Sequence, residues 1–177
     1  GEGAHLVLHG YVSAFSVARC TNITICGFTV DYARTFHSEG TITGVGANYL
    51  DLRFSGAYPY RIVNGDLHFY DEAGAEYPAS HLLEFDAVRR EPAFHARDYW
   101  LRNKTVPAEQ LPNGDVRIFH PGLTGKAGNI LVLGPAHRLC PGVAIDRSQG
   151  VRIEDLTLYH CGGMGVVAQM SSDIELD

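Results

Sequence analysis

The sequence lacks several features that would assign it to a functional class at once. Its 177 residues contain 14 Lys and Arg against 20 Asp and Glu, giving a net charge of −6, and the basic residues form no run. Nucleic-acid-binding proteins concentrate basic side chains on one face, so this composition excludes a nucleic-acid partner. No apolar stretch approaches the roughly 18 residues of a transmembrane helix, and no signal-peptide pattern opens the chain, so no membrane span is expected.

Metal and redox chemistry also have little support in the sequence. Only four cysteines occur, and no two of them form a CxxC pair of the kind that holds zinc or performs thiol exchange. The nine histidines form no ligand pair either, because the single i, i+4 spacing, His5 with His9, falls in β-type sequence. The sequence therefore predicts free, buried thiols, structural histidines and neither a metal nor another cofactor.

What the chain does contain is glycine and apolar residues. With 20 glycines and 45% hydrophobic residues it can bury a sizeable core. It opens on the strand-like "AHLVLHGYV" and stops on "DIELD", which reads as the middle of another strand. We therefore expect a globular all-β piece of a longer protein.

An internal repeat indicates the fold. Residues 15–25 align without gaps to residues 143–153 and to residues 166–176, and the last two copies are offset by 23 residues. Each copy places two short apolar strands on either side of a polar corner, and the same offset leads from Phe15 to Ser38, where "SEGTITGV" begins another strand. This pattern is typical of a right-handed parallel β-helix, in which equivalent positions stack about 4.8 Å apart. It predicts parallel strands near residues 15–18, 22–25, 143–146, 151–153, 166–169 and 174–176.

Between these repeats the pattern changes to antiparallel β structure. Segments such as "YRIVNGDLHFY" and "NILVLG" alternate or run apolar, and the turn signals Asn64-Gly65 and Asn113-Gly114 separate them. The sequence thus predicts three parts: N-terminal coils over residues 1–40, an inserted antiparallel β-barrel over residues 41–139, and a continuation of the β-helix over residues 140–177.

The repeat register predicts which polar side chains share one outward face. Val143 and Ile145 should point inward, so Asp146 should point outward, with Gln169 at the same site of the next coil. Extended to residue 38, the register adds Glu39 to this column beside Ala144, and it pairs Thr41 with Asp146. Three glycines, Gly162, Gly163 and Gly165, lead into the column and would let a ligand approach the backbone. This arrangement suits a sugar held against the side of a β-helix, and a solvated polar face with a glycine turn explains each residue equally well.

Several motifs in the same order resemble a known enzyme family. "NITICGFTVDYARTFHSEGTI", "YPYRIVNG", "LLEFD", "GNILVLG" and "LYHCGGMGVVAQMSSDIEL" are similar to glycoside hydrolase family 110, the bacterial exo-acting α-1,3-galactosidases that include blood-group-B-cleaving enzymes. The resemblance covers nearly the whole chain. It implies a parallel β-helix with inserted β-barrels, an inverting two-carboxylate mechanism without a metal, a terminal galactose as substrate, a homo-oligomer and a secreted or periplasmic location.

The resemblance also implies roles for individual residues. The family's catalytic carboxylates lie around an Asp-Asp-Ala sequence that this chain does not contain, so the pair is expected beyond Asp177 and the chain alone is expected to be inactive. Gln169 and His160 match coils just below that site and become galactose-contacting candidates. Asp31 and Glu39 match a family motif without an assigned role, and with Asp146 they complete the predicted substrate-binding set.

Two other functions fit the predicted fold. A polysaccharide lyase or polygalacturonase-like hydrolase would usually carry Lys/Arg-rich or calcium-binding acidic clusters on its outward strands, and this sequence has neither. For a non-catalytic tailspike or glycan-binding adhesin, a repetitive coil without a glycine-lined pocket would be enough. Within the chain, the one stacked carboxylate pair is Glu154 with Asp177, which we interpret as part of a solvated face.

Overall fold

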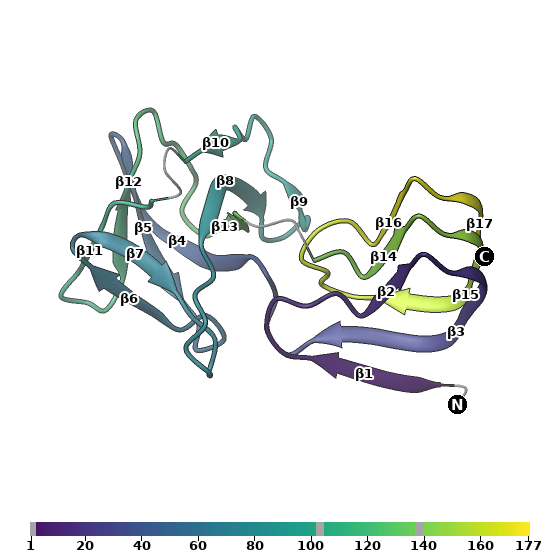
Figure 1. Ribbon diagram of the computed structural model, residues 1–177. Helices are drawn as coiled ribbons and strands as arrows, with labels where there is room; N and C mark the ends of the chain where they lie inside the picture. The colour runs from purple at the N-terminus through teal and green to yellow at the C-terminus, as the bar shows by residue number, and fades with distance from the viewer. Residues whose placement is uncertain (1–2, 102–104, 137–139) are drawn as a thin grey trace. The chain divides into compact units, whose positions relative to one another are not determined.

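The structure, a computed structural model, describes residues 3–101, 105–136 and 140–177, and every regular element in these ranges is a strand. Two compact units divide the chain (Figure 1): unit 1 is Gly1–Thr35 with His137–Asp177, and unit 2 is Phe36–Ala136. In the described ranges there is no helix with the length and hydropathy of a membrane span. The predicted end of the insert, residue 139, lies outside the described residues, and the three-part division stays a prediction.

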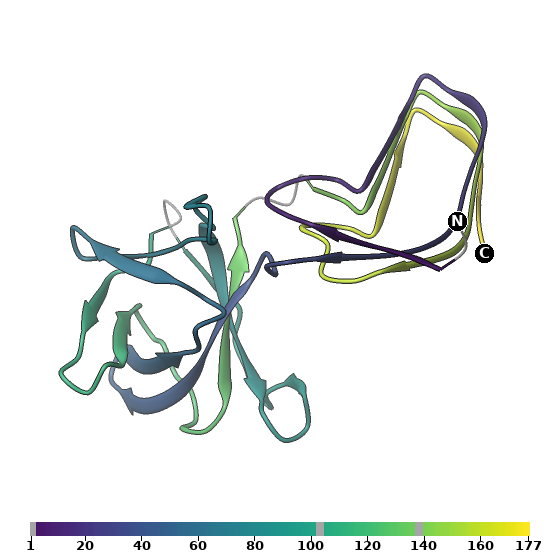
Figure 2. The same cartoon turned by 90° about the horizontal axis from the view of Figure 1, so that it is seen from below.

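Unit 1 consists of two parallel sheets. The first contains, in spatial order, β1 (Ala4–Leu8), β3 (Thr21–Tyr32), β15 (Gln149–Leu158) and β17 (Ser172–Leu176). The second contains β2 (Phe15–Ala18), β14 (Val143–Asp146) and β16 (Val166–Gln169). Seen end-on, the segments of unit 1 follow nested, nearly superposed outlines (Figure 2).

The strand register of unit 1 agrees with the internal repeat. Val143 pairs in parallel with Phe15 on one side and with Val166 on the other. The first sheet follows the same alignment, since Val151 pairs with Ile23 and with Ile174. The parallel pairing predicted for residues 143–146 and 166–169 is confirmed.

Alternation along these strands builds the core of unit 1. Every second side chain points inward, and the six most buried form one cluster: Val17, Ile25, Val143, Ile145, Val151 and Ile153. Val143 and Ile145 are 0% and 1% exposed, whereas their neighbours Ala144 and Asp146 are half-buried. The outward direction of Asp146 follows directly from this packing.

The corner between the two sheets repeats in each copy with the same backbone geometry. Arg19, Arg147 and Met170 occupy equivalent positions and all have positive φ angles, 55°, 46° and 49°. L-residues rarely adopt this left-handed conformation, which costs roughly 1–2 kcal/mol for a residue other than glycine. Its recurrence indicates that the hydrogen bonds at the corner hold the backbone there.

A serine ladder supplies those hydrogen bonds. The Ser148 hydroxyl accepts from the Cys20 N–H at 3.0 Å and donates to the Asp146 carbonyl at 2.9 Å. One copy further on, the Ser171 hydroxyl accepts from the Ser148 N–H at 3.0 Å. Ser148 is only 4% exposed, so its hydroxyl satisfies backbone groups that water reaches poorly.

Unit 2 is antiparallel. Its main sheet runs in the order β10 (Tyr99–Trp100), β8 (Ala79–Asp86), β13 (Ile130–Pro135), β4 (Ser38–Gly46), β5 (Tyr49–Phe54), β12 (Val116–Phe119) and β11 (Ala108–Gln110), with β9 (Glu91–Pro92) beside β8. A hairpin of β6 (Tyr60–Val63) and β7 (Asp66–Phe69) forms a second sheet. Among the described residues the main sheet starts at β10 and ends at β11, and no pairing joins these two strands, so the strand pairings do not show closure of the predicted barrel.

Local sequence explains two features of unit 2. Asn64 and Gly65 join β6 to β7 with φ angles of 53° and 85°, the left-handed pair that a type I′ hairpin turn requires. Asp115 is 2% exposed, and its carboxylate accepts from Arg53 Nε at 2.8 Å, from Thr43 Oγ1 at 2.8 Å and from Asn113 Nδ2 at 3.0 Å. A buried carboxylate this fully engaged has a structural role.

The strand that begins at Ser38 corrects the sequence analysis. It does not continue the parallel stack: β4 pairs antiparallel with β13, so that Glu39 faces Val132, and Thr41 pairs with Ile130 and Arg53. The position next to Ala144 belongs to Ser16, and the position next to Asp146 belongs to Ala18. The offset from Phe15 to Ser38 is a coincidence, since alternation in a strand does not encode whether its partner is parallel or antiparallel.

Candidate functional site

The outward column of the second sheet of unit 1 is the first part of the candidate site. Parallel pairing stacks Ala18, Asp146 and Gln169 in register on β2, β14 and β16. Adjacent positions in such a ladder lie about 4.8 Å apart, so Asp146 and Gln169 can contact the same small ligand. Glu39, the third predicted member of the column, lies in unit 2 and is not part of it.

Asp146 and Gln169 differ in how they are engaged. The Asp146 carboxylate pairs with Arg147 Nη1 at 3.1 Å, and its side chain is 39% exposed. Gln169 is exposed, and within the described part of the chain its side-chain amide makes no hydrogen bond. An amide offers two donor hydrogens and an acceptor oxygen, a combination that suits sugar hydroxyls. Gln169 is therefore the side chain of this column with the most unused hydrogen-bonding capacity.

The glycines beside this column bring backbone segments close together. A Cβ atom at Gly142 would lie 2.7 Å from Leu158 Cδ1 and 2.9 Å from both Cys161 Sγ and the Gly165 carbonyl oxygen. Real Cβ atoms do not approach backbone so closely, so only glycine fits at this position. The Gly165 carbonyl in turn accepts the Val143 N–H at 2.9 Å, which joins the glycine bend to the start of β14.

The second part of the site is the pair Asp31 and His160. His160 Nδ1 lies 2.7 Å from Asp31 Oδ1, and the Tyr32 N–H donates to the same oxygen at 2.7 Å. An ionised carboxylate can only accept, so the imidazole carries its proton on Nδ1 and leaves Nε2 available. The hydrogen bond from His160 lowers the pKa of the Asp31 carboxyl below its ordinary value of 3.8, against the opposing effect of desolvation. The Asp31 carboxylate therefore holds the His160 imidazole in one orientation, and Nε2 of that ring can accept a hydrogen bond.

A tyrosine and two cysteines near this pair have raised pKa values. Burial raises the pKa of Tyr32 to about 12, with the nearby thiols Cys161 and Cys140 adding to the shift, and its hydroxyl donates to the Val12 carbonyl at 2.8 Å. Burial likewise raises the pKa values of the Cys140 and Cys161 thiols. Thiolate chemistry is disfavoured at both cysteines. All four cysteines are free, but the prediction that all are buried is wrong, because Cys26 is exposed.

The five predicted substrate-binding residues thus fall into three places. Asp146 and Gln169 share the outward column, and Asp31 and His160 form a hydrogen-bonded pair in the same unit. Glu39 lies in unit 2, with Oε2 at 3.8 Å from His37 Nε2. No hydrogen bond in the described residues joins the column to the Asp31–His160 pair.

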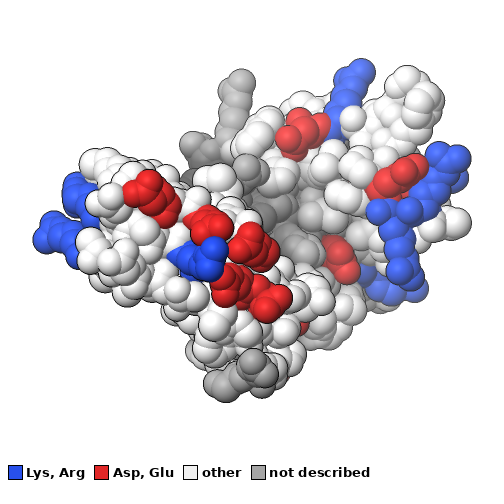
Figure 3. Space-filling model, turned by 90° about the vertical axis from the view of Figure 1, so that its right-hand side faces the viewer, with Lys and Arg blue, Asp and Glu red and all other residues white. Residues whose placement is uncertain are grey.

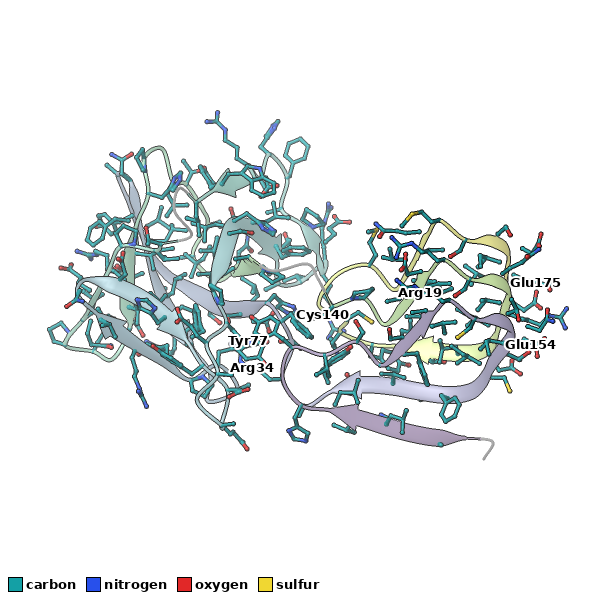
Figure 4. The ribbon with its side chains drawn as sticks, viewed as in Figure 1. Arg19, Arg34, Tyr77, Cys140, Glu154 and Glu175 are labelled. Atoms are coloured by element: carbon teal, nitrogen blue, oxygen red, sulfur yellow. The ribbon has the colours of Figure 1, made fainter. Side chains whose placement is uncertain are left out.

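The carboxylates on the other sheet of unit 1 form an ion-pair ladder. Arg152 Nε and Nη2 contact Glu175 at 2.8 and 3.1 Å, and Arg152 Nη1 contacts Glu154 at 2.9 Å. Figure 3 shows acidic and basic side chains lying next to one another on this side of the molecule, and in Figure 4 Glu154 and Glu175 point away from the stack. Ile153 pairs with Leu176, so Glu154 and Asp177 follow at adjacent positions of strands that are spaced about 4.8 Å apart. An inverting glycosidase separates its two carboxyl groups by roughly 6.5–9.5 Å.

Sequence reasoning missed two features of the site. It did not pair Asp31 with His160, although the gapless alignment of residues 15–25 with 143–153 extends further, to Val30 with Leu158. That extension places Asp31 next to Tyr159 and so identifies the neighbourhood. It also missed the serine ladder. Among the described residues, no group of three or more His, Cys, Asp or Glu side chains is placed to hold a metal ion.

Comparison with known proteins adds to this geometry. Residues 38–131 match the family model described as GLAA-B beta-barrel domain I. The chain is 33% identical over 181 residues to "Alpha-1,3-galactosidase A" of Shewanella woodyi, covering 100% of this chain and 30% of that protein. It is 27% identical over 183 residues to "Alpha-1,3-galactosidase B" of Bacteroides thetaiotaomicron and 28% identical over 196 residues to "Alpha-1,3-galactosidase A" of Streptomyces avermitilis, covering 100% of this chain and 29% and 30% of those proteins. The chain spans about 30% of the length of such relatives.

Proposed function

The chain belongs to the GLAA-B family, and its curated relatives are named alpha-1,3-galactosidases. We propose that the full-length protein that contains this chain removes terminal α-1,3-linked galactose from glycans. The single observation that carries the proposal is the full-length coverage of this chain by proteins of that name. The unused amide of Gln169 and the oriented imidazole of His160 support it, because both suit hydroxyl recognition.

We further propose that unit 1 is a segment of a right-handed parallel β-helix. The two parallel ladders, the 23-residue offset and the repeated left-handed corner support this reading. In such a solenoid the column of Asp146 and Gln169 forms one wall of a substrate cleft, and a following coil would continue it. His160 and Asp31 then hold hydroxyl groups at the neighbouring edge.

The catalytic acid and base belong, in this proposal, to residues outside 1–177. Glu154 and Asp177 follow the paired residues Ile153 and Leu176, where the strand spacing of about 4.8 Å is below the roughly 6.5–9.5 Å of an inverting pair, and Glu154 is engaged by Arg152. Asp115 is buried and fully engaged. The chain alone is therefore expected to bind galactose weakly and to hydrolyse nothing. The secreted or periplasmic location and the homo-oligomeric state remain proposals, to be tested by cell fractionation and light scattering.

A substrate panel tests the function. The full-length protein is incubated with p-nitrophenyl glycosides and with a B-type trisaccharide, and the anomer of the first product is read by proton NMR. We expect release of galactose from α-linked substrates only, with β-galactose formed first because inversion reverses the configuration. Activity on uronate polymers would favour the lyase or polygalacturonase reading, and binding without turnover would favour an adhesin. First formation of α-galactose would contradict the inverting mechanism.

A further inference from the structure

Unit 2 has a groove on the outer face of its main sheet. It has a volume of about 550 Å³ and is lined by His37, Glu39, Phe85, Asp86, Ala87, Arg90, Ile130 and Val132. These residues come from β4 and the residue before it, from β8 and the turn after it, and from β13. Ligand pockets are roughly 300–1,000 Å³, so the groove has room for a small ligand.

The floor of the groove is an apolar outer face of an antiparallel sheet. Ile130 pairs with Phe85, and Val132 pairs with Glu39 and Leu83, so the side chains at these positions share one face. The opposite face is already the core, where Leu82, Leu131 and Leu133 are 0–1% exposed. An antiparallel sheet with one buried face usually presents polar residues on the other. On this sheet Phe85, Ile130 and Val132 of the outer face are apolar and only partly buried.

The rim of the groove has hydrogen-bonding side chains of both positive and negative charge. Asp86 Oδ1 accepts from the Val88 and Arg89 N–H groups at 2.9 Å each, and in the described residues Oδ2 has no partner. The Arg90 N–H donates to the Asp86 carbonyl at 2.8 Å, which fixes the backbone of Arg90 in the turn after β8. Glu39 stands one strand beyond β13, roughly 10 Å from β8 at two strand spacings.

We propose that this groove binds a neutral pyranose. The carboxylates of Glu39 and Asp86 accept hydrogen bonds, and the guanidinium of Arg90 donates them, so the groove can pair with hydroxyl groups that do both. Phe85, Ile130 and Val132 supply the apolar part of the lining, which suits the C–H groups of a sugar ring. Apolar lining with a few convergent polar groups is the usual composition of such sites. The site is distinct from the column of Gln169.

The test is a titration of the ¹⁵N-labelled 177-residue chain with methyl α-D-galactopyranoside, followed by amide chemical shifts. The choice of a galactoside as the probe rests on the proposed function. The proposal that the groove binds a pyranose does not. We expect saturable shifts at Phe85 and Val132, and a dissociation constant at least about fivefold higher for Glu39→Gln and for Phe85→Ala. Glu109→Gln, an exposed carboxylate on β11, is the matched control and should bind like the wild type.

The remaining outcomes are equally decisive. If the galactoside does not bind but methyl glucoside or methyl N-acetylgalactosaminide shifts the same residues, the groove binds a pyranose and the choice of galactose is wrong. Absence of saturable shifts with all three sugars, or equal affinity in Glu39→Gln, overturns the proposal. Shifts at Phe85 that follow dilution of the chain without sugar identify a second copy as the occupant and overturn it as well. None of these results bears on turnover, so a failure here is separate from a failure of the proposed galactosidase activity.

Discussion

Asp31 and His160 are separated by 129 positions in the sequence and by the whole of unit 2, yet their side chains meet at 2.7 Å. The contact forms because Val30 and Leu158 pair in parallel immediately before these residues. Both side chains are partly exposed to solvent, Asp31 by 29% and His160 by 47%. The hydrogen bond between them therefore orients the imidazole and contributes little to the free energy of unfolding.

The Asp31 carboxyl should titrate below 3.8 in the folded chain. Its pKa is depressed chiefly by the hydrogen bond from His160, so replacing His160 with Ala should raise it toward 3.8. A depressed folded-state pKa means that the stabilisation is present above 3.8 and is lost as the pH falls below it through the folded value. Carboxyl ¹³C chemical shifts across pH 2 to 6, a range chosen to bracket the roughly 3.9 of an unperturbed Asp, measure this directly. An unchanged Asp31 midpoint in His160→Ala would show that the hydrogen bond does not set the pKa.

At the scale of single residues, the sequence predicted whether a side chain points inward or outward better than it predicted which residues that side chain contacts. The outward orientation of Asp146 and Gln169 followed from the alternation of Val143 and Ile145 and was correct. The partner of Asp31 was missed because the repeat alignment was not extended to Val30 and Leu158, which pair just before Asp31 and His160. Glu39 was misplaced for a different reason, because its partner Val132 lies on β13 and local patterns do not reveal that pairing.

At the scale of elements, the corner of unit 1 depends on one buried hydroxyl. Ser148 satisfies the Cys20 N–H, and no other side chain in the described residues contacts that group. Ser148→Ala should reduce the free energy of unfolding by roughly 1–3 kcal/mol, the cost of leaving a buried donor unsatisfied. Urea unfolding of the 177-residue chain measures the change. Ser172, an exposed serine at the start of β17, makes no side-chain hydrogen bond in the described residues, and Ser172→Ala should stay within about 0.5 kcal/mol of the wild type.

Equal effects of the two substitutions would show that the ladder does not hold the corner. The positive φ angles of Arg19, Arg147 and Met170 would then need another explanation. The sequence could not predict this ladder, because a polar corner of Cys, Ser and Ser reads as an ordinary turn. Its meaning depends on stacking, which places each hydroxyl beside the N–H group of the neighbouring copy.

At the scale of the whole molecule, two architectures share one chain. Parallel ladders in unit 1 arise from a repeat that is visible in the sequence, and the antiparallel sheet of unit 2 arises from alternating strands with Asn-Gly turns. The class of each part was predictable because periodicity and turn chemistry are local. The open path of the main sheet was not, since closure depends on which strands meet at its two ends.

The central claim is that unit 1, through the column ending at Gln169, holds the galactose. The kcat/KM of Gln169→Leu in the full-length protein tests it most directly. Loss of one or two polar contacts, each worth about 0.5–1.5 kcal/mol, should lower kcat/KM roughly 10-fold, with little change in stability because the side chain is exposed. Asp146→Asn, one position lower, should lose less activity, and Glu109→Gln in unit 2 should keep wild-type kinetics. Wild-type kcat/KM in Gln169→Leu and Asp146→Asn together would contradict the claim.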